Sequence, residues 1–576
     1  MTTLDSILRF EALRSELQAV ADQVAIRFAR SSLSPVIREY LDFSTAICMP
    51  DGRMLAQGFS LPLHLGAVPR AMEAVLARFP EGLAPGDLVV LNDPYAGGMH
   101  LPDIFAVAPA FCGDERVAYI VVVAHHIDIG GRVPGGSGSD SREIFEEGLR
   151  LPPVKLISEG RRSVALDEVI RANVRLPDVL AGDLDAQVSG CVQGAQGLAE
   201  LAGRHGAATF ADLAEAILDH GRRSLESELR SWPEGTYTFE DVEDHDGLSD
   251  TPVRIVVTVR IADGRVAFDF SGTDPQVQGS INATLSFTES ACYAAVRALA
   301  QEDVPVNAGF MEQVDVRTTP GTVVHAAFPA GVAARGVIGY RVIECVYGAL
   351  ASAMPDRVPA AGDGGTTGLR FGGIVNGRRF QVNDIVCGAW GARPSADGID
   401  GAANMAANVS NRSAEEIERD DPLLVREYAL VPDTGGAGRH RGGLAIRRSL
   451  EVLAPEATLN LRSHRNRTPP YGLHGGQPGS VSATWLVRDG ETTLLPAKTT
   501  VQVRRGDVVV HHTAAGGGVG DPAERDPSLV EDDIRNGKVS ERLAREQYGW
   551  APVDAGRKVG TRAPSLDEQG RDEEKR

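Results

Sequence analysis

Val117-Ala-Tyr-Ile-Val-Val-Val-Ala124 is a run of mostly branched apolar residues, and it predicts a β-strand in the N-terminal part of the chain. Leu88-Val-Val-Leu-Asn92 predicts a second strand. The segment Asn92-Asp-Pro-Tyr-Ala-Gly-Gly98 follows it, and its Asp-Pro and Gly-Gly steps favour a tight turn. We therefore expect His100, just after this turn, to lie at the rim of the strand that precedes it.

Histidines and aspartates gather at the ends of these two predicted strands. His100-Leu-Pro-Asp103 follows the turn, and His125-His126-Ile-Asp128 follows the longer strand. Imidazole nitrogen combined with carboxylate oxygen suits Zn, Mn or Fe(II), whereas sites made only of oxygen suit Mg or Ca. No cysteine belongs to either motif, so the pattern favours an open catalytic metal site over a closed structural zinc site.

The same motifs are compatible with a site that binds no metal. In that interpretation His125 and His126 are partly buried at the end of a strand and form hydrogen bonds with nearby carboxylates. The spacing of the residues alone does not separate the two interpretations.

The composition is that of a soluble globular protein. The chain has 576 residues, of which 43% are hydrophobic, and six cysteines with no short-spaced pair. No apolar run approaches the roughly 18 to 20 residues of a spanning helix, and the first residues lack the pattern of a signal peptide. A net charge of −20 argues against binding to nucleic acid or to an anionic membrane. We expect a cytoplasmic protein.

The order of patterns along the chain predicts an α+β, multidomain fold with mixed sheets and amphipathic helices. Apolar residues at helical spacing predict helices over residues 5–30 and 209–230, and Asp51-Gly52 predicts a hairpin whose first strand carries Asp42. A strand, an Asp263-Gly264 turn and another strand then begin a new region. The expected divisions are a metal-binding catalytic domain over 1–235, an α/β middle region over 236–430, a glycine-rich, mainly β module over 431–525 whose glycines form turns, and a charged, disordered tail over 526–576.

Residues 130–141 are rich in glycine, and we expect them to form a mobile loop beside the metal site rather than part of the core. The acidic residues that follow include Glu143, Glu146 and Glu147, and Lys155 lies a little further along. These side chains could supply a base or a substrate clamp. A solvated acidic surface is the alternative.

No segment predicts a nucleotide site. The glycine-rich segments could cradle an anion through their backbone amides, but none contains the Gly-Lys-Ser/Thr of a Walker motif. None opens a helix after a strand in the manner of a dinucleotide-binding fingerprint. We expect ATP to bind elsewhere than in this chain.

Several separate motifs, in a fixed order, resemble those of the hydantoinase B/oxoprolinase family. The resemblance covers the chain from its first fifty residues to about Pro522. The motifs are Asn92-Asp-Pro-Tyr95, Gly98-Met-His-Leu-Pro-Asp103, Asn173-Val-Arg-Leu-Pro177, Gly182-Asp-Leu-Asp-Ala-Gln187, Asp269-Phe-Ser-Gly-Thr273 and Gly435-Gly-Ala-Gly-Arg-His-Arg-Gly-Gly443.

This resemblance implies a hetero-oligomer with a hydantoinase A-type subunit that binds ATP and phosphorylates a small cyclic amide or ketone. The B-type subunit would carry the metal and complete the reaction. The family's metal ligands match His100, Asp103 and His125, with Asp42 as the fourth. Proton transfer would then fall to Asp128 or to a glutamate of the acidic segment, Glu143 or Glu146.

Hydrolysis of an activated cyclic amide, of the hydantoin, 5-oxoproline or lactam class, is the reaction that the resemblance favours. An ATP-dependent ketone carboxylase of the acetone or acetophenone type is the first alternative, and the moderate chain length argues against it. A non-catalytic scaffold that only holds the ATP-binding subunit is the second.

Overall fold

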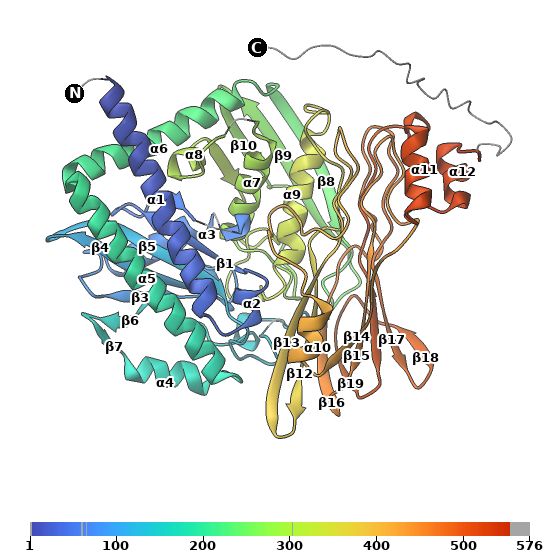
Figure 1. The fold of residues 1–576 in the computed structure, drawn as a ribbon, viewed down its shortest axis with the longest axis horizontal. Helices are drawn as coiled ribbons and strands as arrows, with labels where there is room; N and C mark the ends of the chain where they lie inside the picture. Colours follow the sequence, from blue (N-terminus) through green and yellow to red (C-terminus); the bar gives the residue numbers. More distant parts are fainter. Residues whose placement is uncertain (1–2, 59–60, 65, 137, 302, 553–576) are drawn as a thin grey trace, which may run out of the picture.

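The computed structural model describes residues 3–58, 61–64, 66–136, 138–301 and 303–552. Four β-sheets lie among helices, with the N-terminal and middle segments on one side and the glycine-rich C-terminal segments on the other (Figure 1). This arrangement confirms the predicted α+β, multidomain fold with mixed sheets.

The first sheet has seven strands in the order β2-β1-β5-β4-β3-β6-β7. Helices α1 (Thr3–Ser31) and α5 (Pro177–His205) pack together, and α5 packs on the long central strands (Figure 1). Glycine at position 194 allows this close approach, because a Cβ there would lie 2.8 Å from the side chain of Ile120. The strands are β1 (Phe43–Cys48), β2 (Met54–Gln57), β3 (Leu88–Leu91), β4 (Asp103–Cys112), β5 (Glu115–His125), β6 (Val154–Ser158) and β7 (Arg161–Arg162).

The second sheet has the order β11-β10-β9-β8. The strands on either side of the Asp263-Gly264 turn pair as predicted, and the helices predicted over 5–30 and 209–230 form α1 and α6. The strands are β8 (Gly235–Glu243), β9 (Val253–Ala262), β10 (Arg265–Asp269) and β11 (Val314–Arg317). The remaining helices of this half are α2 (Pro35–Arg38), α3 (Ala67–Arg78), α4 (Val164–Ala172), α6 (Ala207–Leu229), α7 (Leu285–Leu299), α8 (Ala308–Met311) and α9 (Gly336–Leu350), with 3-10 turns at Pro62–His64, Pro94–Ala96 and Ile144–Glu146.

One hydrophobic core joins the first two sheets. It contains Val121 and Phe105 of the first sheet, Val257 of the second, and Ile338 of α9. The boundary predicted at residue 235 therefore does not separate two independent cores.

Two further sheets enclose the core of the C-terminal module. Their orders are β13-β12-β16-β19 and β14-β15-β20-β17-β18, and leucines such as Leu369, Leu450 and Leu459 fill the space between them. Since β12 and β13 belong to this unit, it begins well before residue 431. Its elements are β12 (Thr366–Val375), β13 (Arg378–Cys387), α10 (Ala414–Asp420), β14 (Leu423–Leu430), β15 (Ile446–Val452), β16 (Glu456–Arg462), β17 (Ala483–Arg488), β18 (Glu491–Leu494), β19 (Lys498–Arg504) and β20 (Val508–His512).

Three glycine-rich segments, residues 435–443, 471–479 and 514–520, pack backbone against backbone; we call them the glycine layer. Gly516 N donates to Gly443 O, and Leu473 N donates to Gly518 O, each at 2.9 Å. A Cβ on Gly442 would lie 1.9 Å from Gly516 O. These segments were predicted as turns of a β module. Most of their glycines are instead required because side chains would not fit between the packed backbone segments.

The tail predicted as disordered from residue 526 forms two helices in the part that the structure describes, so that prediction is wrong for residues 527–535 and 541–548. After a 3-10 turn at Pro522–Glu524, the chain forms α11 (Pro527–Arg535) and α12 (Glu541–Tyr548). Asp533 on α11 is buried and forms ion pairs with the buried Arg441 and Arg525. One acidic side chain of this charged segment is thus paired inside the structure. The rest of the predicted tail, 553–576, lies outside the described residues.

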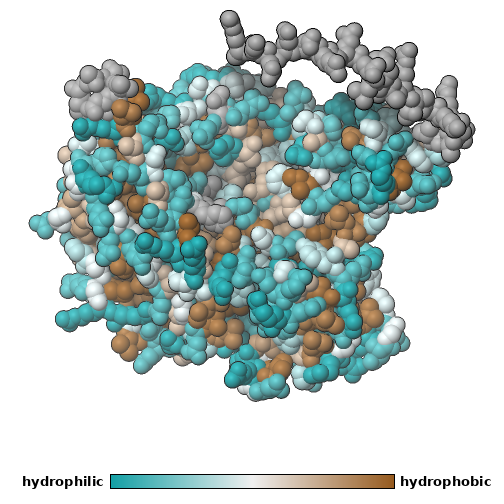
Figure 2. Space-filling model, viewed as in Figure 1, coloured by the Kyte–Doolittle hydropathy of each residue, from teal (hydrophilic) through white to brown (hydrophobic). Residues whose placement is uncertain are grey.

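On the face seen in Figure 2, hydrophilic residues cover most of the surface, and hydrophobic residues form small groups between them. Within the described ranges, no helix combines the length and the apolar content that crossing a membrane requires.

Candidate metal centre

Antiparallel pairing of β4 with β5 brings the two predicted motifs together. Asp103 begins β4 and lies opposite His125, which ends β5. His100 lies in the turn just before β4. Ligand atoms of His100, Asp103 and His125 all lie within 4.8 Å of one another, and all three residues are buried. The structure therefore brings together three of the residues that the sequence suggested as metal ligands, and we call them the triad.

The polar atoms of this triad are buried without the partners that such atoms need. Both ring nitrogens of His100, Nδ1 of His125 and Oδ1 of Asp103 make no hydrogen bond with the described part of the chain. His100 Nε2 lies 3.1 Å from Asp103 Oδ1, and the two imidazole rings are 5.0 Å apart. Buried polar groups are normally satisfied, so these converging atoms fit a bound cation.

Electrostatics favour the protonation states that bind a metal. Burial lowers the pKa of His100 to about 4, and Arg335 acts in the same direction. Burial also lowers the pKa of His125 well below its ordinary value. Both imidazoles are therefore neutral near pH 7, which is the form that donates a lone pair to a cation.

Asp42 lies beside the triad at the start of β1. Its carbonyl oxygen accepts a hydrogen bond from the backbone N–H of His125 at 3.0 Å. Burial raises the pKa of its carboxyl group to about 7, and the charge of Asp103 contributes to this rise. Asp42 is thus an electrostatic neighbour of the triad, and its role as a fourth ligand stays a prediction.

Arg335 is a component of the site that no motif indicated. Its guanidinium donates to Asp103 Oδ2 at 2.6 Å, and it lies at the N-cap of α9. Burial opposes ionisation of Asp103, but His100 and Arg335 together hold the pKa of this carboxyl below its usual range. A residue 232 positions away in sequence could be found only from the tertiary structure.

Asp128, predicted as a proton carrier, instead binds the backbone of two separate segments. Its buried carboxylate accepts hydrogen bonds from the backbone N–H groups of Gly130, Arg175 and Leu176. This arrangement argues for a structural role. It also explains why the Asn-Val-Arg-Leu-Pro motif lies near the site.

The other predicted proton carriers, Glu143 and Glu146, are not buried as the triad is. Glu143 is exposed, and the carboxylate of Glu146 pairs with Arg132 at 3.0 Å. Glu147 is the acidic residue of this segment that is buried, and it accepts hydrogen bonds from the N–H groups of Val332 and Ala333. Burial raises the pKa of Glu147 to about 8, so this group retains a proton near neutral pH.

The loop predicted to be mobile beside the site, residues 130–141, is largely buried. Ser139 donates to the carbonyl oxygen of Leu461 at 2.9 Å, and Ser280 donates to that of Gly138 at 2.7 Å. Several of the glycines allow close packing, since a Cβ on Gly131 or Gly136 would lie 2.6 Å from the carbonyl oxygen of Glu147. The prediction that this segment stays out of the core is therefore wrong.

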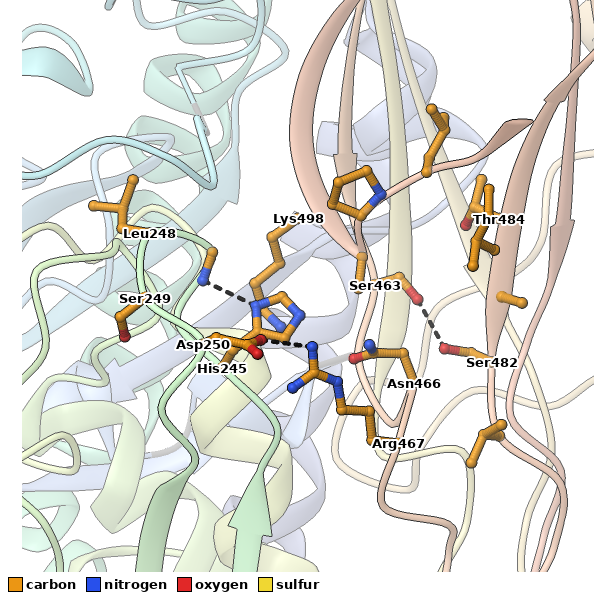
Figure 3. A pocket seen from close by; sticks show the side chains of 17 residues that line it. His245, Leu248, Ser249, Asp250, Ser463, Asn466, Arg467, Ser482, Thr484 and Lys498 are labelled. Atoms are coloured by element: carbon orange, nitrogen blue, oxygen red, sulfur yellow. Dashed lines mark hydrogen bonds and ion pairs between the residues drawn. The ribbon is translucent and has the colours of Figure 1, made fainter.

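A cavity of about 650 Å³ lies between the loop after β8 and the C-terminal module (Figure 3). Lys498 at its wall forms a buried ion pair with Glu243 at 2.7 Å, and Arg467 forms an ion pair with Asp250 at 2.5 Å. None of the four predicted metal ligands lines this cavity.

The family model described as hydantoinase B/oxoprolinase matches residues 6–522. The chain belongs to this family. This membership confirms the resemblance seen in its motifs.

Two relatives from this hydantoinase B/oxoprolinase family cover nearly the whole chain. The B component of a putative D-/L-hydantoinase from Pseudomonas sp. (strain NS671) is 30% identical, over 95% of this chain and 95% of its own length. The beta subunit of the caprolactamase of Pseudomonas jessenii is 30% identical, over 95% of this chain and 96% of its own length.

Two solved structures share the fold of this family member. The crystal structure of the ATP-dependent caprolactamase from Pseudomonas jessenii superposes with a TM-score of 0.89 at 29% identity, over 96% of this chain and 98% of that one. A nucleotide-free acetone carboxylase superposes with a TM-score of 0.88 at 19% identity, over 94% of this chain and 79% of that one. The second likeness is one of fold alone.

Proposed function

We propose that this chain is the metal-containing subunit of an ATP-dependent cyclic-amide hydrolase of the hydantoin, 5-oxoproline or lactam class. The observation that carries the proposal is the buried set of unpartnered ligand atoms on His100, Asp103 and His125. Relatives named as subunits of a hydantoinase and a caprolactamase supply the reaction class. Their names also support a hetero-oligomer, and we propose a hydantoinase A-type subunit that binds ATP as the partner.

His100, Asp103 and His125 would hold a divalent cation, with Asp42 as the fourth ligand. Zn, Mn or Fe fits two imidazoles and carboxylates better than Mg or Ca does. Such a cation supplies Lewis acidity, which polarises a carbonyl or phosphoryl oxygen and lowers the pKa of water.

The chain's own residues would orient these ligands. Arg335 fixes one oxygen of Asp103 and leaves the other oxygen facing His100. His126 lies within 3.2 Å of Gln187, whose amide donates to the backbone oxygens of Ile104 and Val122. These bonds hold the ends of β4 and β5 in register, and such supporting contacts commonly tune metal sites. Glu147 could hold a proton at Oε2, which is buried without a partner.

Carboxylation of a ketone is the second candidate, and the acetone carboxylase fold match is the observation behind it. Chain coverage favours hydrolysis. The chain spans 98% of the caprolactamase structure but only 79% of the acetone carboxylase structure.

The test is to copurify the chain with its ATP-binding partner and to measure ATP turnover and ring-opened product with hydantoins, 5-oxoproline and caprolactam. We expect cyclic-amide turnover without bicarbonate, lost in the His100→Ala/His125→Ala variant and retained in His440→Ala. Ketone-dependent ATP turnover that requires bicarbonate would establish the carboxylase instead. Full activity of the double variant would contradict both hydrolysis and carboxylation at this site, and it would favour a scaffold role for the chain.

A further inference from the structure

Two arginines besides Arg335 are buried near the candidate metal centre. Arg335, Arg370 and Arg462 are 9%, 4% and 7% exposed. Arg335 comes from the N-cap of α9, whereas Arg370 and Arg462 come from β12 and β16 of the C-terminal module. Two separate parts of the fold thus deliver positive charge to one place.

Strand register places Arg370 and Arg462 on the same face of their sheet. Gly368 lies opposite Arg462, and Arg370 lies opposite Asn460, so the two arginines are diagonal neighbours across the strand pair. Long side chains in this relation reach one another. Each interacts electrostatically with Asp42 and with Arg335, and Arg370 also acts on both imidazoles of the triad.

The described partners of Arg335 and Arg462 leave some of their buried donors unused. Arg335 binds Asp103, and Arg370 Nε donates to the neutral amide of Asn383 at 2.8 Å. Arg462 has no ion pair among the described residues, and Nε of both Arg335 and Arg462 is buried without a hydrogen-bond partner. Burial, with the charge of Arg335 acting in the same direction, lowers the pKa of Arg462 to about 10. Arg462 therefore still carries its charge near pH 7.

A formal charge count shows what is missing. Asp103 is paired with Arg335, the carboxylate of Asp42 acts on Arg462, and a divalent cation would add two positive charges to this balanced set. Glu147, the other acid that acts on Arg335, keeps its proton near neutral pH. Buried charge without compensation is costly, so the site is complementary to an anion.

We infer that Arg335, Arg370 and Arg462 form a subsite for a dianionic phosphoryl group, the group that an ATP-binding partner would place on the substrate. This inference rests on the proposed function and names the form in which the substrate reaches the metal centre. Guanidinium forks bind phosphate oxygens in pairs, and three acceptor oxygens can serve several forks at once. A carboxylate carries half the charge and one acceptor oxygen fewer.

The test uses inorganic phosphate as the probe and isothermal titration calorimetry as the measurement. Wild-type protein is compared with Arg370→Gln, Arg462→Gln and Arg462→Lys, and with Arg378→Gln as a control. Arg378 lies exposed at the tip of the β12–β13 hairpin, on the same sheet. Metal content and thermal midpoint are recorded for every variant, and acetate is titrated in parallel.

We expect phosphate to bind the wild type and the Arg378→Gln control equally. Each glutamine variant should bind it about tenfold to a hundredfold more weakly at unchanged metal content, because a hydrogen bond to a charged group is lost. Arg462→Lys should keep the charge but lose the paired geometry, and so fall between them. Binding should persist, more weakly, in chelator-treated wild type.

Three results would overturn the inference: no phosphate binding by the wild type, equal binding by the glutamine variants, or tighter binding of acetate than of phosphate. The proposed function is judged separately, by metal content and cyclic-amide turnover. Phosphate binding in a protein without metal or turnover would keep the subsite and reject the function. Normal turnover in a variant that no longer binds phosphate would keep the proposed function and reject the subsite.

Discussion

Arg335 donates to Asp103 Oδ2 at 2.6 Å across 232 residues of sequence, and both side chains are buried. The contact joins the N-cap of α9 to the first residue of β4. It leaves Asp103 Oδ1 facing His100 at 3.1 Å. One aspartate thus links the position of α9 to the geometry of the candidate metal centre.

Replacing Arg335 by Gln should leave the Asp103 charge buried without its partner. Loss of one member of a buried ion pair costs about 3–5 kcal/mol, so the metal-free variant should unfold at a clearly lower denaturant concentration. Metal loading should restore part of the loss, because a cation also neutralises Asp103. Arg335→Lys, which keeps the charge, serves as the control. Equal stability of Arg335→Gln and wild type without metal would show that the pair contributes nothing.

Metal content follows from the buried triad. Purified wild type should contain roughly one Zn, Mn or Fe per chain, as measured by inductively coupled plasma mass spectrometry. His100→Ala/His125→Ala should lose it while keeping its circular dichroism spectrum, and His440→Ala in the glycine layer should retain it. A wild-type protein that takes up none of these ions on incubation would contradict the assignment.

Glu147 should make stability fall with rising pH. Its folded pKa is raised from 4.5 to about 8 by burial, so between these values the folded chain holds a proton that the unfolded chain has lost. The contribution of this proton is complete below pH 4.5 and is lost at up to about 1.4 kcal/mol per pH unit as the pH rises to 8.

Glu147→Gln removes this titration while keeping the acceptor for the amides of Val332 and Ala333. Its thermal midpoint relative to wild type should therefore rise steadily from pH 5 to pH 8. Glu143→Gln, an exposed change in the same segment, should show no such trend. Parallel profiles for Glu147→Gln and wild type would refute the prediction.

Gly442→Ala should be strongly destabilising. Its Cβ would lie 1.9 Å from Gly516 O, which is backbone and cannot move aside alone, so a loss of about 3 kcal/mol or more is expected. Gly203→Ala is the matched control, since its Cβ meets nothing within 4 Å in α5. That change should stabilise the protein by up to about 1 kcal/mol through helix propensity. Urea unfolding measures the free energy of unfolding of both variants relative to wild type. No change in Gly442→Ala would contradict the prediction.

Local patterns in the sequence correctly predicted several strands of the fold. β-branched runs identified β3 and β5. The family resemblance supplied His100, Asp103 and His125, which lie in the turn before β4 and at the paired ends of β4 and β5. The arginines around Asp42 could not be predicted in this way, since Arg335, Arg370 and Arg462 reach the site only through packing of distant elements. Periodicity carries no information about such contacts.

Charge and glycine content were the misleading signals. The segment after residue 525 is highly charged, yet Asp533 is paired inside the structure rather than solvated. The glycines of residues 130–141 indicated flexibility, but they allow close packing instead. The charge and glycine content of a segment are the same whether it is solvated or packed inside the structure. Only the contacts that its residues make separate these two possibilities.

The glycine layer has a consequence for how sequence variation among relatives should be interpreted. At Gly436, Gly442 and Gly516 even a methyl group would overlap a neighbouring backbone, so natural selection would remove substitutions there whether or not the protein is catalytic. Invariance at these positions would reflect how closely the backbone segments of this chain pack against one another. A search for active-site residues that ranks positions by invariance alone would therefore be drawn to the glycine layer and away from the metal centre.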